Sequence, residues 1–307
     1  MDIAVSTSIL CDTGSPETYL RLIAEAGFTH LHWGHHWDTD FLYSSFEIAQ
    51  CKKWLRTYGL KLLDIHGSEG VEKQWFSPEE YRRRSGVELV LNRVVMLREL
   101  EGPGCVMMHL PPNRAIKSTP EDERLLPARV EALKRSLDEI VPALEKYDAR
   151  LAVENRRNDS FRVISEVMAE YPTERIGITL DTGHANIDEG RGLDRMERFK
   201  DRLLALHLND NDGAGDLHQP PFYGTLDWER VARLVATSAY AGRPASFELI
   251  MCHTPFFVPD LPLAEQPEKN LKAFLADTYD RCRKVAEMIE RAGKTARKMQ
   301  RGTRISE

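Results

Sequence analysis

The sequence predicts one α/β domain, a single (β/α)8 barrel in which eight parallel strands alternate with outer helices. The first observation is that short apolar runs alternate with segments long enough for one helix each. The second is that six of these runs end on a side chain that can bind a metal: His66, His109, Glu154, Asp181, His207 and Glu248. Because barrel active sites lie at the carboxyl ends of the strands, we expect these side chains to meet at one rim.

The length of the chain agrees with a single domain. The 307 residues could hold two average domains, but (β/α)8 barrels of roughly 250 residues form only one. We expect the barrel over residues 1–292 and a basic tail over residues 293–307. An open, doubly wound sheet is the alternative, but it would not naturally bring side chains from six successive strands to one place.

Each expected strand is a short apolar run bounded by turn residues or by the end of a helix. The expected strands cover residues 3–7, 29–33, 60–65, 105–108, 150–153, 176–180, 203–206 and 245–247. They are separated by segments with helical spacing of apolar residues, as a parallel barrel requires.

The expected helices carry local start and stop signals. The strings Ser15-Pro16-Glu17 and Ser77-Pro78-Glu79 combine an N-cap residue, a proline at the first helical position and an acid in the first turn. Gly27 and Gly59 are placed to end helices. The expected helices cover about residues 16–26, 45–58, 78–101, 120–147, 159–170, 193–202 and 268–292, and one more begins near residue 227.

The composition is ordinary for a globular protein, with 42% apolar residues and a net charge of −6. The negative charge weighs against a nucleic-acid partner, because it gives no global basic field. The N-terminus lacks the pattern of a signal peptide, and no apolar run could span a bilayer. Five cysteines without CxxC spacing fit a reducing compartment. We therefore expect a cytoplasmic protein without a membrane partner.

Four of the strand-end side chains form a mixed set of hard ligands: Glu154, Asp181, His207 and Glu248. Two glutamates, one aspartate and one histidine suit Mn²⁺, Mg²⁺, Co²⁺ or Zn²⁺ and leave room for substrate oxygens. A structural zinc site would favour thiolates in a closed tetrahedron. We expect a divalent cation and no organic cofactor, with Asn209 and Asp210 orienting His207.

The strings around these side chains are more specific than the ligand types. They read VENR at Glu154, LDTGHA at Asp181, LHLNDNDG at His207 and FELI at Glu248. With them the sequence resembles the xylose isomerase-like TIM-barrel superfamily, which holds sugar and sugar-phosphate isomerases and epimerases and, as a relative, endonuclease IV. The resemblance covers about residues 1–290 and is strongest over the last four strands.

The resemblance to the ketose epimerases implies a reaction. Glu154, Asp181, His207 and Glu248 would bind one divalent metal that chelates the substrate carbonyl and a neighbouring hydroxyl. One glutamate would remove a proton and the other would return it through an enediolate, while His184 would hydrogen-bond a substrate oxygen. The chain departs from those epimerases at Asp216-x-His218, where they place an arginine nearby.

The resemblance to endonuclease IV implies a second arrangement, in which nine ligands hold three zinc ions that activate a water and clamp a phosphodiester. Every ligand has a candidate in this chain: His66, His109, Glu154, Asp181, His184, His207, Asp216, His218 and Glu248. That nuclease also needs basic loops that bend DNA, whereas the loops expected after the second and third strands are acidic to neutral.

The interpretation that follows is a metal-dependent isomerase or epimerase of carbohydrate metabolism that acts on a sugar-like hydroxy-carbonyl compound. A multi-zinc phosphodiesterase, a metal-dependent lyase or dehydratase, and a non-catalytic sugar-binding protein are the alternatives. The set of buried charged ligands weighs against the last, because such charges are costly when they are not used. The apolar, proline-rich segment 254–268 is a candidate contact in a homo-oligomer.

Overall fold

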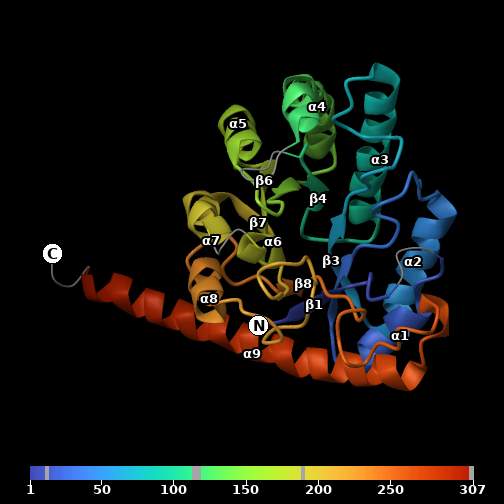
Figure 1. The fold of residues 1–307 in the computed structure, drawn as a ribbon, viewed down its shortest axis with the longest axis vertical. Coiled ribbons are helices and arrows are strands. Elements are labelled where there is room, and N and C mark those ends of the chain that lie inside the picture. Colours follow the sequence, from blue (N-terminus) through green and yellow to red (C-terminus); the bar gives the residue numbers. More distant parts are fainter. Residues whose placement is uncertain (11–13, 113–118, 188–190, 304–307) are drawn as a thin grey trace.

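The computed structural model describes residues 1–10, 14–112, 119–187 and 191–303, and in this part of the chain eight parallel strands form a (β/α)8 barrel (Figure 1). Every strand lies within one residue of its expected bounds. The strands are β1 (Ile3–Ser6), β2 (His30–Trp33), β3 (Lys61–His66), β4 (Val106–His109), β5 (Leu151–Glu154), β6 (Ile176–Asp181), β7 (Leu203–His207) and β8 (Ala245–Phe247).

The barrel closes between its last two strands by a short contact. The remaining neighbours pair in chain order, and β1 pairs with β8. Between β7 and β8 a single parallel bridge joins Leu208 to Phe247, with Leu208 N donating to Ser246 O at 3.0 Å. Glu248 N in turn donates to Leu208 O at 3.2 Å. The seam of the barrel therefore lies directly beside His207 and Glu248.

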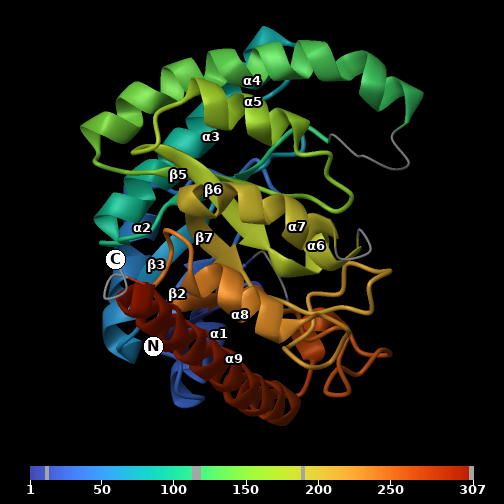
Figure 2. The same cartoon turned by 90° about the vertical axis from the view of Figure 1, so that its left-hand side faces the viewer.

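Helices surround the strands on the outside (Figure 2). Their bounds are α1 (Glu17–Glu25), α2 (Ser45–Tyr58), α3 (Glu80–Glu99), α4 (Pro120–Lys146), α5 (Arg162–Glu170), α6 (Thr182–Ile187), α7 (Arg191–Met196), α8 (Trp228–Ala236) and α9 (Glu268–Thr303), with 3-10 helices η1 (Glu197–Arg202) and η2 (Leu263–Glu265). The start of α2 is a capping box made by Ser44 and Glu47, and Gly59 ends it with φ of 66°. No helix in the described ranges is both long and apolar enough to cross a membrane.

Three of the expected helices differ from the sequence expectation. The segment expected as one helix over 193–202 is α7 followed by the 3-10 helix η1. Helix α5 begins three residues late because Phe161, whose amide donates to Asp159 Oδ1 at 2.6 Å, has φ of 59° and cannot continue a helix. Helix α9 passes residue 292 and runs to Thr303, and the last four residues of the expected tail, 304–307, lie outside the described residues.

The barrel interior below the strand-end ligands is partly polar. Side chains two residues before each ligand also face inward, because successive side chains of a strand alternate between its faces. They are Asp64, Met107, Ala152, Thr179, Ala205 and Ser246, and all are buried. Most of these residues are small, and Asp64 places a carboxylate where barrels usually hold branched apolar side chains.

The loop after β2 contains a buried histidine that predicts a pH effect on stability. His35 donates from Nε2 to Gly14 O at 2.8 Å, and burial lowers its pKa from the usual 6.5 to about 4. In the unfolded chain His35 therefore becomes protonated below about pH 6.5, whereas in the folded chain it stays neutral down to about pH 4. Stability should fall by roughly 3 kcal/mol over this window and level off below it.

Denaturant unfolding of the wild type and of His35→Gln at several pH values between 7.5 and 4 checks this effect. Glutamine keeps a donor for Gly14 O but does not titrate, so the two free energies of unfolding should converge as the pH falls. Parallel curves would show that His35 is not the group responsible.

Candidate metal centre

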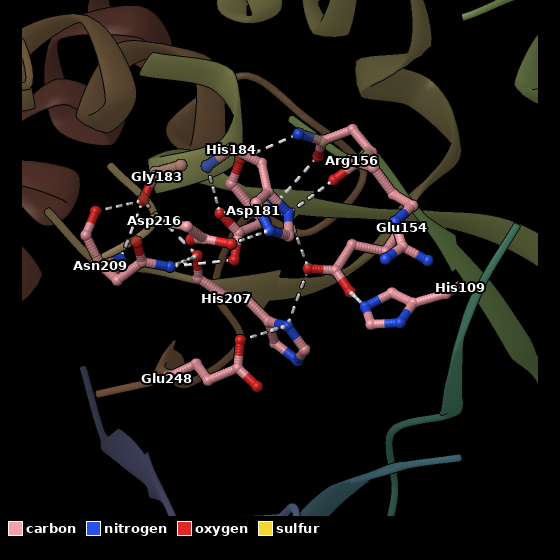
Figure 3. A network of polar contacts seen from close by, with 12 residues as sticks. His109, Glu154, Arg156, Asp181, Gly183, His184, His207, Asn209, Asp216 and Glu248 are labelled. Atoms are coloured by element: carbon pink, nitrogen blue, oxygen red, sulfur yellow. Dashed lines mark hydrogen bonds and ion pairs between the residues drawn. The ribbon is translucent and has the colours of Figure 1, made fainter. Parts of the chain in front are cut away.

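The strand-end side chains lie together at the carboxyl end of the barrel, as Figure 3 shows for most of them. Nine metal-capable side chains from β3 to the loop after β8 resolve into three groups, in each of which the ligand atoms lie within 4.8 Å of one another. We call them the four-residue group (Glu154, Asp181, His207, Glu248), the His66 group (His66, His109, Glu154) and the His184 group (His184, Asp216, His218). Glu154 is shared by the first two.

The four-residue group is centred on an imidazole between two carboxylates. His207 Nδ1 lies 3.1 Å from Glu154 Oε1 and 3.1 Å from Glu248 Oε2 (Figure 3). Glu154, Asp181 and His207 are buried, whereas the Glu248 side chain keeps 14% exposure. Solvent therefore reaches the group from the Glu248 side.

The His66 group lies on the β3 and β4 side. His109 Nε2 is 3.0 Å from Glu154 Oε2, and its Nδ1 is 2.6 Å from Glu69 Oε2. His66 Nδ1 lies 2.8 Å from Gly67 O. A carbonyl oxygen only accepts, so Nδ1 of His66 carries the hydrogen and Nε2 is left with a lone pair. This ring is prepared as a ligand.

The His184 group lies on the opposite side. His184 Nε2 is 3.0 Å from Asp216 Oδ2, and His218 Nε2 is 3.2 Å from Asp216 Oδ1. His218 Nδ1 is 3.5 Å from Glu248 Oε2, which connects this group to the four-residue group. The backbone of His218 has φ of 43°, a left-handed value that is uncommon outside glycine and is held here by the loop.

Helix α6 was not expected from the sequence, and it positions two of these groups. Asp181 Oδ1 accepts from His184 N at 2.7 Å, so the last residue of β6 caps the helix that carries His184. Asn155 fixes the same strand end: its Oδ1 accepts from Asp181 N at 2.8 Å, and its backbone O lies 2.9 Å from His184 Nδ1. Asn209 Nδ2 donates to Asp181 Oδ2 at 2.9 Å.

Gly183 lies against this support. A methyl group at Gly183 would overlap Asn209 Oδ1, so Gly183→Ala should displace the amide that holds Asp181. We expect cation affinity to fall by about 10–100-fold, the usual effect of losing a residue that orients a ligand. Competition with a chromophoric chelator measures it. Gly293→Ala is the control, because its methyl group would meet nothing nearer than Arg297 Nη2 at 3.8 Å; equal affinity in both variants would contradict the prediction.

Electrostatics within the groups follow from burial and close contact. Burial opposes the charge of Glu154, but His207 and His109 outweigh it and hold the pKa of Glu154 well below its usual range. Burial together with nearby Glu154 raises the pKa of Asp181 to about 6. Burial lowers the pKa of His66 to about 3, so its ring is neutral at pH 7. Neutral imidazole and ionised carboxylate are the forms that bind metals.

The residues of these groups fit divalent cations. His207 Nε2 is buried and has no hydrogen-bond partner in the described part of the chain. The three carboxylates of the four-residue group repel one another, and a bound cation would offset that repulsion. The oxygen and nitrogen donors suit Mn²⁺, Co²⁺ or Zn²⁺. They do not form the thiolate site that is typical of a structural zinc.

Several residues of the site were missed or misjudged from the sequence. Asp210 does not orient His207: its carboxylate accepts from the Trp228 indole at 3.0 Å and from backbone amides of the loop after β7. Glu69 supports His109, and its position three residues after His66 was the only available signal. The Trp37 ring lies 4.5 Å from that of His66, where it covers the His66 group.

The barrel and its convergent histidines and carboxylates define a class of protein in which side chains able to bind a metal come from many strands to one rim. The family model described as "Xylose isomerase-like TIM barrel" matches residues 20–277. The chain therefore belongs to the xylose isomerase-like TIM barrel family. The uncharacterised protein y4fM of Sinorhizobium fredii is 30% identical over 254 residues, which are 76% of this chain and 80% of that protein.

Solved structures share the fold. A D-tagatose 3-epimerase-like protein is 20% identical with a TM-score of 0.65, and the match covers 91% of this chain and 99% of that one. An L-ribulose 3-epimerase is 16% identical with a TM-score of 0.67, covering 97% and 98%. The 3-keto-D-glucoside 4-epimerase YcjR of E. coli is 19% identical with a TM-score of 0.64, covering 91% and 99%.

Proposed function

We propose that this protein is a divalent-metal-dependent isomerase or epimerase of a small sugar or other hydroxy-carbonyl compound. The observation that carries the proposal is the four-residue group, in which two glutamates from different strands lie on either side of His207. The similarity of the fold to structures named as sugar epimerases supports the same substrate class.

The chain's own residues would perform the proton transfer. Glu154, which is buried and ionised, would take the proton from the carbon next to the substrate carbonyl. Glu248, whose side chain keeps 14% exposure, would pass a proton from solvent to the other side of the enediolate, and Glu154 would release its own proton to solvent. His184 would hold a substrate oxygen. A cation held by Glu154, Asp181, His207 and Glu248 would supply Lewis acidity that makes the reacting C–H more acidic.

The second candidate is a multi-metal phosphodiesterase, and a specific observation favours it. The nine side chains form three neighbouring groups rather than one, and each group offers three or more ligand atoms. Three cations, two of which would share Glu154, would fit the chemistry by which metal clusters clamp a phosphodiester. The net charge of −6 supports the sugar reading, because a nuclease needs basic loops for DNA.

Metal analysis followed by isotope exchange tests the proposal. Protein purified without added metal is analysed for Mn, Co, Zn and Mg, and is then incubated in deuterated water with D-tagatose, D-psicose, L-ribulose and a 3-keto-D-glucoside, the sugars named for structural neighbours. Bound metal and deuterium at the carbon beside a carbonyl are the expected results. Bound metal, no deuterium and hydrolysis of a model phosphodiester would favour the second candidate instead.

The remaining assignments are proposals of the same kind. We propose a cytoplasmic protein whose partner is the small-molecule substrate, with segment 254–268 as a contact in a homo-oligomer. Mass measurement in solution tests the oligomer, and a monomeric mass would remove segment 254–268 from consideration as an interface.

A further inference from the structure

A buried carboxylate–imidazole pair lies beneath the four-residue group and takes no part in the chemistry described so far. His32 of β2 and Asp64 of β3 are register partners in adjacent strands and are 0% and 2% exposed. His32 Nδ1 lies 2.8 Å from Asp64 Oδ1. Burying such a pair in a barrel interior costs more free energy than burying the branched apolar residues that usually fill it. A functional role would explain why the pair is present.

The hydrogen bond with Asp64 fixes the direction of the His32 ring. A carboxylate oxygen accepts, so Nδ1 carries the hydrogen and Nε2 of the neutral ring holds a lone pair. Nε2 is buried and has no hydrogen-bond partner within the described ranges. The pair therefore presents one unused basic nitrogen at a defined place.

The His32 ring lies against the centre. The His32 ring packs edge-on against His207, with ring centroids 4.4 Å apart and planes at 69°. Ligand atoms of His32, His207 and Glu248 lie within 4.8 Å of one another. His207 Nε2 is also buried and unpartnered in the described part of the chain. Two buried ring nitrogens without hydrogen-bond partners in the described residues therefore lie beside a carboxylate.

We propose that His32, together with His207 and Glu248, binds a divalent cation at the floor of the centre, and that Asp64 is its positioning residue. The neutral His207 ring has one lone pair, so it binds either this cation or the one held by the four-residue group. The inference rests on the proposed function, because it extends the metal site invoked there. Two imidazoles and one carboxylate suit Zn²⁺, Co²⁺ or Mn²⁺. A carboxylate that accepts from the far nitrogen is the usual support of a metal-binding histidine, and Asp64 has this position.

Cobalt titration of the full-length protein, stripped of metal, tests the inference. Co²⁺ affinity is measured by competition with a chromophoric chelator, and the visible d–d absorption reports the ligands. His32→Gln should weaken one class of bound Co²⁺ by about 10–100-fold and change its absorption. Asp64→Asn should also weaken it, because an amide can donate to Nδ1 and move the hydrogen to Nε2. The loss should be smaller than in His32→Gln, because the amide oxygen can still accept from Nδ1.

His35→Gln is the matched control, since this buried histidine lies three residues away and bonds to Gly14 O outside the groups. Its Co²⁺ affinity and spectrum should equal those of the wild type. A folded His32→Gln with unchanged affinity and spectrum overturns the inference while the proposed function stands, provided the wild type binds Co²⁺ and exchanges deuterium. A wild type that binds no Co²⁺ overturns both. If His32→Gln does not fold, an unchanged Asp64→Asn overturns the inference.

Discussion

Glu154→Gln is expected to lower the rate of deuterium exchange into the substrate by about 10²–10⁴-fold, the usual contribution of a general base. Glutamine keeps the shape of the side chain but cannot accept the proton. Glu154 also contacts His207 at 3.1 Å and His109 at 3.0 Å, so the variant should hold its cations less tightly as well. Exchange is therefore measured at saturating metal, with the bound metal determined in the same sample.

Two further variants separate proton transfer from general damage to the centre. Glu248→Gln should show a loss similar to that of Glu154→Gln, because both glutamates serve the same transfer. Glu69→Gln changes a carboxylate that supports His109 from outside the four-residue group, and about a 10-fold loss is expected. Equal losses in all three variants, or full exchange in metal-loaded Glu154→Gln, would contradict the assigned roles.

Asp210→Ala is expected to have the largest effect on stability. The buried carboxylate accepts from four donors: Asn211 N, Phe222 N, Leu226 N and Trp228 Nε1. Leaving these donors without an acceptor should cost at least about 4 kcal/mol of unfolding free energy, at 1–3 kcal/mol for each unsatisfied group. The same bonds hold the loop that carries Asp216 and His218, so that loop should also become accessible to proteases.

Denaturant unfolding and limited proteolysis measure the two effects. Asp227→Ala is the control on the same loop, because Asp227 caps α8 through one exposed hydrogen bond to Arg230 N and should cost only about 1 kcal/mol. If Asp210→Ala is no less stable than Asp227→Ala, the buried acceptor does not hold the loop.

The strands and the strand-end side chains were predictable from the sequence because a parallel barrel turns one-dimensional order into a shared rim. His66, His109, Glu154, Asp181 and His207 each occupy the last position of a strand, so knowing the strand is nearly enough to place the side chain. The expected and observed bounds of each strand differ by no more than one residue.

The division into three groups was not predictable in the same way. It depends on which ring nitrogen or carboxylate oxygen faces which neighbour across the barrel, and spacing along the chain carries no such information. Helix α6 was missed because Asp181 both ends β6 and caps α6, and the sequence pattern indicates only the end of the strand. The inward position of Asp64 was predictable, because Asp64 lies two residues before His66 in the same strand and faces the same side.

The seam between β7 and β8 would give a bound cation a mechanical role. One bridge, Leu208 to Phe247, joins these strands, yet His207 and Glu248 stand on either side of it. An ion bound by both side chains would connect β7 and β8, the neighbouring strands that the shortest ladder joins. Binding of the metal would then stabilise the barrel as well as support its reactivity. Removal of the metal would loosen the barrel first between β7 and β8.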